Sequence, residues 1–264
     1  MSLENALGST VADIISHKVL EEHSMVRSLR NILQDGHRTG VKVIAEVKPS
    51  SPGSGTLMPL GRKSLAEVVK KMEVGGASAI SVLVEPRKFN GSPEVLEFVR
   101  GLTDLPLLAK GFHFDPLHLA QCKAAGADAY LQMVRVVDVV GRSQRELLQL
   151  GASLGLEAVV EANSGYEVQK ALDFGAEIIS MNNRRIYGDM KLDLEMAALG
   201  RDLPPGIVFV SASGIESPRD LRAVYENSGR RVDAVLVGTS VMRAENTHKQ
   251  VEILVNAGKK VVHQ

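Results

Sequence analysis

The sequence predicts one (β/α)8 barrel of the TIM type, in the α/β class, preceded by an N-terminal helical extension. Three observations predict it. The chain has 264 residues, a common length for a single barrel of this kind. Eight short runs rich in β-branched residues alternate with helical patterns, and no shift in composition divides the chain. We therefore expect a single domain over residues 1–264, with the extension over 1–40 and the barrel over 41–264.

The chain begins with a stretch of mixed basic and acidic residues whose apolar residues recur at helical spacing, from Thr10 to about Leu33. We expect this helical segment to pack against the barrel. The first strand follows at residues 42–47, KVIAEV. Residues two apart on a strand point to the same side, so Glu46 and Lys48 should project together if the strand continues that far.

A segment rich in serine, proline and glycine, PSSPGSGTLMP at residues 49–59, comes directly after the first strand. We interpret it as a lid that closes over a ligand, with Gly53 and Gly55 supplying the backbone freedom for closure. A plain flexible loop is the alternative interpretation.

The other seven strands are predicted from β-rich runs, and helical patterns lie between them. In these patterns apolar residues fall three and four apart, and a glycine often closes the helix. The strands are expected at residues 79–84, 107–110, 128–134, 157–162, 177–182, 207–211 and 233–238. The helical patterns cover residues 64–76, 92–102, 115–126, 144–155 and 164–176.

Composition narrows the class of protein and of partner. The 31 basic residues balance the 31 acidic residues, which gives no reason to expect nucleic acid or an anionic membrane as a partner. No apolar run approaches the about 20 residues of a membrane span, and no signal peptide opens the chain, so we expect a cytoplasmic protein. Cys122 is the one cysteine; it has no internal disulfide partner and is expected to be a small buried packing residue.

Active sites of such barrels are built where the strands end, and there the sequence is unusually polar. The strand ends together carry two lysines and three carboxylates, and a rim that only faced solvent would not need so many charges in one circle. Charges held close together in a partly dry cup shift one another's pKa, as acid–base catalysis requires. The polar strand-end residues are Glu46, Lys48, Glu85, Lys110, Gln132, Arg135, Glu161, Asn182, Asn183, Arg184, Ser211, Ser213, Thr239 and Ser240.

The ends of the last two strands carry a second signal. In SASGIESPRDL and VGTSVM, glycine and small hydroxyl residues stand at a strand-to-helix junction. Free backbone N–H groups and the positive end of a helix bind anions at such junctions, and the loops after strands seven and eight are the usual phosphate site of this fold. The pair of junctions therefore predicts a phosphorylated ligand.

Seven segments together resemble the indole-3-glycerol phosphate synthase family. They are IAEVKPSSPGSG, SVLVEPRKFNGS, LLAKGF, VVEANS, ISMNNRRI, VSASGIESPRDL and DAVLVGTSVMRAE, and their order and spacing hold from about Val41 to Glu245. The resemblance implies a carboxy-lyase of tryptophan biosynthesis. Such an enzyme closes the ring of 1-(2-carboxyphenylamino)-1-deoxyribulose 5-phosphate and releases indole-3-glycerol phosphate, carbon dioxide and water.

The resemblance also implies that the reaction uses no cofactor and no metal. The residues agree, because no cluster of histidine, cysteine and carboxylate has zinc-like spacing, and GSGTL lacks the setting of a dinucleotide site. The expected partner is then a small phosphorylated substrate, with no nucleic acid and no membrane. Other enzymes of the tryptophan pathway are candidate partners that the sequence does not identify.

Five residues match the catalytic positions of the family. The resemblance makes Lys110 the acid that protonates the ribulose carbonyl, and a lysine whose pKa is lowered by neighbouring cations suits this role. Asn182 would be a donor that positions the sugar chain. How the second protonation and the deprotonation divide among the other three residues stays open. Those three are Lys48, Glu46 and Glu161.

Further matched positions imply how the substrate is held. A planar guanidinium fork suits the anthranilate carboxylate, which Arg184 and Ser51 would anchor. The residues that would wall the aromatic ring are Phe89, Phe112 and Leu131. The residues that would hold the phosphate are Gly214, Gly238 and Thr239 through their backbone, with Ser213 and Lys48 nearby.

Four positions depart from the family pattern. Where the family usually has aspartate directly after the third-strand lysine, this chain has Gly111, and where it usually has glutamate in the seventh-strand motif, this chain has Ala212. Loss of the second carboxylate should lower the pKa of the nearby lysines further. Val84 stands in place of threonine, and Gly53 stands in place of serine.

Two other functions stay open at this point. A paralogous barrel that isomerises or cleaves another phosphorylated sugar would keep the phosphate junctions, and a Schiff-base aldolase would use Lys110 or Lys48. A barrel retained only as a binding subunit would have no need of all five catalytic matches.

Overall fold

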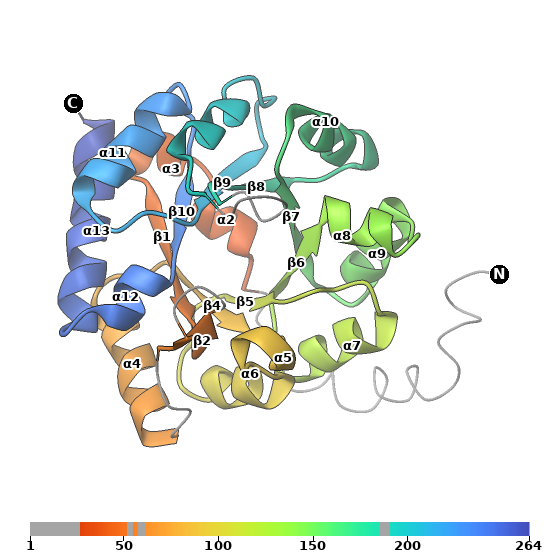
Figure 1. Ribbon diagram of the computed structural model, residues 1–264, viewed down its shortest axis with the longest axis horizontal. Coiled ribbons are helices and arrows are strands. Elements are labelled where there is room, and N and C mark those ends of the chain that lie inside the picture. The colour runs from red at the N-terminus through yellow and green to blue at the C-terminus, as the bar shows by residue number, and fades with distance from the viewer. Residues whose placement is uncertain (1–26, 52–54, 58–61, 185–190, 264) are drawn as a thin grey trace.

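A closed barrel of eight parallel strands forms the centre of the computed structural model, and helices surround it (Figure 1). The structure describes residues 27–51, 55–57, 62–184 and 191–263. The strands follow one another around the barrel in chain order and the last closes against the first, which confirms the predicted (β/α)8 fold. The strands are β1 (Lys42–Val47), β4 (Ala79–Leu83), β5 (Leu107–Lys110), β6 (Ala129–Met133), β7 (Glu157–Ala162), β8 (Ile178–Asn182), β9 (Val208–Ala212) and β10 (Ala234–Val237).

Helices cover the outside of the barrel, and each of the five predicted helical patterns coincides with one to within two residues at either end. The connection between β8 and β9 instead holds a 3-10 helix, η1 (Leu194–Gly200), which the sequence did not predict. Among the described residues no helix is long and apolar enough to cross a membrane. The α-helices of the described residues are α2 (Leu29–Leu33), α3 (Gly36–Thr39), α4 (Arg62–Val74), α5 (Pro86–Phe89), α6 (Pro93–Arg100), α7 (Pro116–Ala124), α8 (Val134–Val139), α9 (Gln144–Ser153), α10 (Gly165–Phe174), α11 (Pro218–Asn227), α12 (Thr239–Arg243) and α13 (Thr247–Val262).

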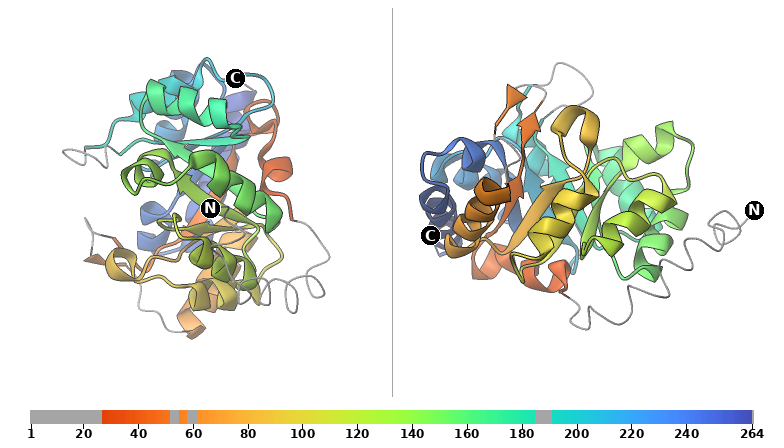
Figure 2. Two further views of the ribbon diagram at one scale, coloured as in Figure 1. Left: turned by 90° about the vertical axis from the view of Figure 1, so that its right-hand side faces the viewer. Right: turned by 90° about the horizontal axis from the view of Figure 1, so that it is seen from below.

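Helix α2 closes the end of the barrel at which the strands begin. Leu29 and Leu33 are fully buried and pack against the inward-facing residues of the strands. Figure 2 shows α2 and the hairpin that follows β1 at opposite ends of the barrel. The expected helical extension is thus present in its C-terminal part, which ends at Leu33 as predicted, while residues 10–26 lie outside the described residues.

Two hydrogen bonds to one carboxylate tie α2 to the barrel. Glu157, the first residue of β7, accepts from Ser28 Oγ at 2.6 Å and from the backbone N–H of Arg30 at 3.0 Å. A carboxylate at the first turn of a helix satisfies free N–H groups and faces the positive end of the helix. The extension is therefore held by polar contacts as well as by its two leucines.

Alternate residues of each strand point into the barrel. In the lower layers these residues are apolar, and near the carboxyl ends of the strands they become charged or polar, as at Glu46, Lys110 and Glu161. The pleat therefore places the polar residues directly above an apolar floor. The inner core consists of Ile44, Ala79, Leu108, Ala129, Leu131, Met133, Val159, Ile178, Val208, Val210, Ala212, Ala234 and Leu236, together with Leu29 and Leu33.

Candidate active site

Glu46 contacts both lysines of the barrel mouth. Its carboxylate lies near the end of β1 and the residue is 1% exposed. Lys110, the last residue of β5, donates from Nζ to Glu46 Oε2 at 2.7 Å, and Lys48 Nζ lies 3.6 Å from Glu46 Oε1. The predicted convergence of these three residues is confirmed. One buried carboxylate between two ammonium groups fixes the direction in which each cation points.

The pKa values of the two lysines are shifted in opposite directions. Burial disfavours the charge of Lys110, but Glu46 and Glu161 outweigh burial, so the pKa of Lys110 lies above its usual value. Burial lowers the pKa of Lys48, and Glu46 does not fully compensate because Lys110 is also near. Burial would raise the pKa of Glu46, yet the two lysines hold it below its usual value. The expectation of a lowered lysine pKa is therefore wrong for Lys110, which faces two carboxylates, and correct for Lys48.

Glu161, near the end of β7, is the second buried carboxylate of the mouth and is 1% exposed. Burial raises its pKa, and the charge of Lys110 and hydrogen bonds from Asn182 and Asn163 only partly offset this. Its Oε1 atom has no hydrogen-bond partner among the described residues. A carboxyl group with a raised pKa and a free oxygen is suited both to take up and to give a proton.

The end of β8 is tied to the loop that follows β9. Asn182 Oδ1 accepts the backbone N–H of Arg184 at 3.0 Å, and this bond shapes the turn after the strand. Asn183, which is fully buried, donates from Nδ2 to Ser211 Oγ at 3.0 Å and to the carbonyl oxygen of Ser213 at 2.9 Å. Asn182 therefore faces the mouth beside Glu161 while its neighbour braces the wall, and the Arg184 side chain is exposed at the rim.

The two predicted phosphate junctions lie side by side. Ser240 Oγ donates to the carbonyl oxygen of Ile215 at 3.1 Å, which links the start of α12 to the loop after β9. Ser213 and Gly214 both have positive φ, 73° and 76°, so the chain turns sharply as it leaves β9.

Gly238 connects β10 to α12, whose first residue is Thr239. A Cβ atom at Gly238 would lie 2.5 Å from Glu46 Oε1, closer than a real contact allows. The absence of a side chain here therefore leaves room for the buried carboxylate. It also leaves the backbone N–H groups at the start of α12 beside the charged mouth.

The expected aromatic wall is only partly assembled. The ammonium of Lys48 lies 5.7 Å from the centre of the Phe89 ring, which puts this ring at the mouth. Phe112 follows β5 and is 37% exposed. Leu131 is 4% exposed and belongs to the inner core. Met133, two residues further along β6, pairs with Glu161 in the β6–β7 register and is therefore level with its carboxylate. Sequence reasoning missed Met133, although the two-residue period of the strand could have indicated it.

The described part of the predicted lid is a short hairpin that lies against α5. Its strands are β2 (Ser50–Ser51) and β3 (Gly55–Thr56), and Ser50 Oγ donates to the carbonyl oxygen of Gly55 at 3.1 Å. Ser51 therefore stands in a strand near the helix that carries Phe89. Gly53 lies outside the described residues.

Two polar strand-end residues serve the scaffold instead of the mouth. Glu85 caps α5, where its carboxylate accepts three backbone N–H groups at 3.0, 2.7 and 3.3 Å. It does not replace the carboxylate that is absent at Ala212. Gln132 is fully buried on the outer side of β6, where it hydrogen-bonds to Tyr130 at 2.8 Å and to Gln144 at 2.9 Å. The prediction that Gln132 belongs to the mouth is wrong. The residues on either side of it in β6 point into the barrel, so the Gln132 side chain points outward.

Two of the departures from the family pattern explain each other. A Cβ atom at Gly111 would lie 2.9 Å from Cγ2 of Val84, so the valine methyl fills the space that a side chain at residue 111 would need. Ala212 pairs with Asn182 in the β8–β9 register and belongs to the inner core. A carboxylate at that position would face the mouth, as the sequence indicated.

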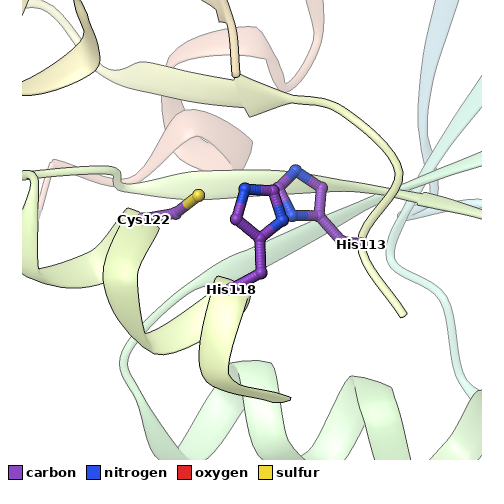
Figure 3. A group of neighbouring side chains, drawn as sticks. All are labelled: His113, His118 and Cys122. Atoms are coloured by element: carbon purple, nitrogen blue, oxygen red, sulfur yellow. The ribbon is translucent and has the colours of Figure 1, made fainter. Parts of the chain in front are cut away.

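One group of potential metal ligands occurs among the described residues, and it lies outside the mouth. It consists of His113, His118 and Cys122, at the β5–α7 connection and on α7 (Figure 3). The expectation that no cluster has zinc-like spacing did not take this group into account. The sequence pattern that could have indicated it is that His118 and Cys122 are four residues apart and share one face of a helix.

The sequence model of the family described as indole-3-glycerol phosphate synthase matches residues 8–254 of this chain. Three relatives carry the name indole-3-glycerol phosphate synthase. The relative from Methanopyrus kandleri is 37% identical over 236 residues, which cover 88% of this chain and 89% of the relative. The relative from Carboxydothermus hydrogenoformans is 38% identical over 90% of this chain and 89% of its own length. The relative from Streptomyces griseus is 40% identical over 83% of this chain and 79% of its own length.

Solved structures with low sequence identity share the fold. Thiamine phosphate pyrophosphorylase from Pyrococcus furiosus superposes with a TM-score of 0.63 at 20% identity, covering 89% of this chain and 99% of that one. (S)-3-O-geranylgeranylglyceryl phosphate synthase from Thermoplasma acidophilum gives a TM-score of 0.60 at 14% identity, covering 88% and 99%. These similarities concern the barrel architecture alone.

Proposed function

Because this chain belongs to the indole-3-glycerol phosphate synthase family, we propose that the buried charges at its barrel mouth carry out the ring closure of that family. The activity is that of a carboxy-lyase of tryptophan biosynthesis. The substrate is a phosphorylated small molecule, 1-(2-carboxyphenylamino)-1-deoxyribulose 5-phosphate. The observation that carries the proposed roles is the pair of lysines held by one buried carboxylate, with a second buried carboxylate beside them.

The first step needs an acid at the ribulose carbonyl. Lys110 supplies the proton to the carbonyl oxygen while the ring carbon that bears the carboxylate attacks the carbonyl carbon and forms the new bond. A raised pKa keeps the Lys110 ammonium charged before the reaction, and its contact with Glu46 aims it into the mouth. Carbon dioxide then leaves from the same ring carbon, and its bonding electrons restore the aromatic ring.

The second half of the reaction is a dehydration. The hydroxyl group formed from the carbonyl leaves as water after it receives a proton, and a base removes a proton from the adjacent carbon of the former sugar chain. We assign the base to Glu161, because its pKa is raised and its Oε1 atom has no partner among the described residues. Lys48, whose pKa is lowered, is the better placed of the two lysines to give a proton to the leaving hydroxyl.

The rest of the mouth positions the substrate. The backbone of the two linked loops after β9 and β10 holds the phosphate. Lys48 is near these loops, because its ammonium and Gly238 both lie beside Oε1 of Glu46. Asn182 donates to the sugar chain beside Glu161. The rim residues Arg184 and Ser51 hold the anthranilate carboxylate, and the ring lies between Phe89 and Phe112 above Leu131. The hairpin after β1 closes over the ligand as a lid.

The reaction takes place in the cytoplasm on a diffusing substrate, with no nucleic acid or membrane as a partner. The equal numbers of basic and acidic residues, 31 of each, support this part of the proposal because they give no general attraction to polyanions. Other enzymes of the tryptophan pathway are the candidate protein partners.

A direct assay tests the proposed function. Purified protein is mixed with 1-(2-carboxyphenylamino)-1-deoxyribulose 5-phosphate, and indole fluorescence is followed as product forms. Turnover of about 1 per second or more is expected. Glu161→Gln should bind substrate with little change in KM and lose most of kcat, since it keeps the shape of the side chain but cannot take up the proton. Binding without turnover in the unaltered protein would contradict the proposal.

A further inference from the structure

Three metal-ligating side chains meet on the outer side of the barrel, behind the strand that ends in Lys110. His113 lies in the connection after β5, and His118 and Cys122 lie one helical turn apart on α7. One potential ligand atom from each side chain lies within 4.8 Å of the other two. Figure 3 shows the two imidazoles lying against each other and the thiol of Cys122 directed toward them. None of the three has a role in the proposed ring closure.

His113 presents an unused lone pair to this space. The residue is 1% exposed, and its Nε2 atom lies 3.1 Å from the carbonyl oxygen of Ala109, so Nε2 carries the proton and donates it. Nδ1 then has a free lone pair, and it has no hydrogen-bond partner among the described residues. A buried polar atom without a partner is costly. A histidine that donates one ring N–H to a backbone carbonyl and offers the other nitrogen is the usual arrangement of a metal ligand.

His118 and Cys122 supply the other two donors. The His118 ring stacks on the His113 ring with centroids 4.9 Å apart, and it is half-buried, so it gives the space an approach from solvent. Cys122 is fully buried beside it and is not part of a disulfide. Two imidazole nitrogens and one thiolate form a donor set that zinc favours. Tetrahedral zinc needs ligand atoms about 3.3–3.6 Å apart, so side chains whose ligand atoms now lie within 4.8 Å of one another must draw closer when zinc binds.

We propose that His113, His118 and Cys122 bind one zinc ion, with a water molecule in the fourth position on the solvent side of His118. Cys122 binds as a thiolate, and its proton passes to solvent. The ion fastens the connection after Lys110 to α7. The ion takes no part in ring closure, because its ligands lie outside the barrel whereas the reacting groups lie inside the mouth.

Equilibrium dialysis against zinc, followed by metal analysis, tests the proposal. The unaltered chain should bind one zinc ion, and cobalt in its place should give the visible absorption and thiolate charge-transfer bands of tetrahedral coordination. His118→Ala and Cys122→Ser should each weaken binding by about tenfold or more, and Cys122→Ser should abolish the thiolate bands. The half-buried position of His118 makes its variant the less disruptive of the two.

Control variants separate this site from other histidines. His263→Ala, on an exposed residue, and the double variant H17A/H23A should leave the stoichiometry and the affinity unchanged. Zinc should also raise the melting temperature of the unaltered chain and not that of His118→Ala. Absence of bound zinc, or equal binding by His118→Ala, would overturn the proposal. The ring-closure assay is independent of either result.

Discussion

Glu46 couples the protonation of two lysines that share its carboxylate. Lys110 faces Glu46 and Glu161, so its pKa rises, whereas Lys48 is buried beside a second cation, so its pKa falls. Two identical side chains thus acquire different acidities from their neighbours alone. The difference in pKa suits a reaction with two successive protonations, in which each lysine must keep its proton until its own step.

Lys110→Ala should lower kcat by about 10²- to 10⁴-fold with little change in KM, because it removes a proton donor that acts in the transition state. Lys110→Arg should also be inactive, since a guanidinium keeps the charge beside Glu46 but rarely gives up a proton. Steady-state kinetics with the carboxyphenylamino substrate measures both variants. Lys249→Ala, on an exposed lysine of α13, is the control. An unchanged kcat in Lys110→Ala would sink the assignment.

Residue identity predicted the charged centre of the site better than it predicted the walls. Glu46, Lys48 and Lys110 could be placed together because strands of a barrel end at one rim. Glu85 and Gln132 could not be placed correctly, because a helix cap and an outward-facing hydrogen-bond network look the same in the sequence as a mouth residue. Met133 was missed because an apolar residue at a strand end carries no chemical signal.

Two elements, α2 and the β2–β3 hairpin, lie at opposite ends of the barrel. At the lower end, α2 inserts two leucines into the inner core and is held by Glu157. At the end where the strands finish, the β2–β3 hairpin lies against α5 (Figure 2). The lower element therefore contributes to stability, and we propose that the upper element acts as the lid over the ligand.

Leu33→Ala should lower the free energy of unfolding by about 2–5 kcal/mol, because it removes a fully buried side chain and leaves a cavity beneath the inner core. Urea unfolding followed by circular dichroism measures the change. Ile32→Ala is the matched control, since Ile32 lies in the same helix and is 39% exposed. The kcat of folded Leu33→Ala should stay close to that of the unaltered chain. Equal losses of stability in the two variants would contradict the expectation that α2 stabilises the barrel by burying Leu33 in the inner core.

The order and the positions of the strands and helices could be predicted more fully than their details. Hydrophobic runs fixed all eight strands to within one or two residues, since a buried parallel strand is apolar throughout. The η1 helix was not predicted because 3-10 helices occur in short pieces, whose three-residue repeat is too brief to stand out in the sequence. The ligand group on α7 was overlooked because His113 joins it only through the fold of the connection after β5.

The whole molecule separates chemistry from stability along the barrel axis. The apolar inner core is continuous from Leu29 and Leu33 of α2 up to the charged mouth. Because the extension shares this core with all the strands, we propose that residues 1–264 form one domain, with 1–40 as the extension and 41–264 as the barrel. Changes of protonation in the mouth therefore take place at one end of the barrel, whereas α2 stabilises the packing at the other end.

This separation predicts that mild acid removes activity before it unfolds the protein. The pKa of Glu161 is raised by burial, so the base becomes protonated at a pH above the ordinary 4.5 of a glutamate. The pKa of Glu46 is lowered by its two lysines. Its stabilising contribution is therefore fully present above pH 4.5 and is lost only as the pH falls through the lower value of the folded state. The acid limb of kcat/KM should accordingly lie above pH 4.5, while the ion pair that Glu46 makes is still intact.

The measurement is kcat/KM against pH, with circular dichroism at each pH as the control for folding. That control is needed because burial lowers the pKa of His113 to about 3. Between this value and the ordinary 6.5 of a histidine, the unfolded chain binds up to one more proton at this residue than the folded chain does. The free energy of unfolding therefore falls by up to about 1.4 kcal/mol for each pH unit by which the pH is lowered in this range. Activity should still be lost while the circular dichroism is unchanged, and it should return when the pH is raised. Glu161→Gln should have no acid limb of this kind in its residual activity. If activity and folded structure disappeared together at every pH, Glu161 would not be the group whose protonation stops the reaction.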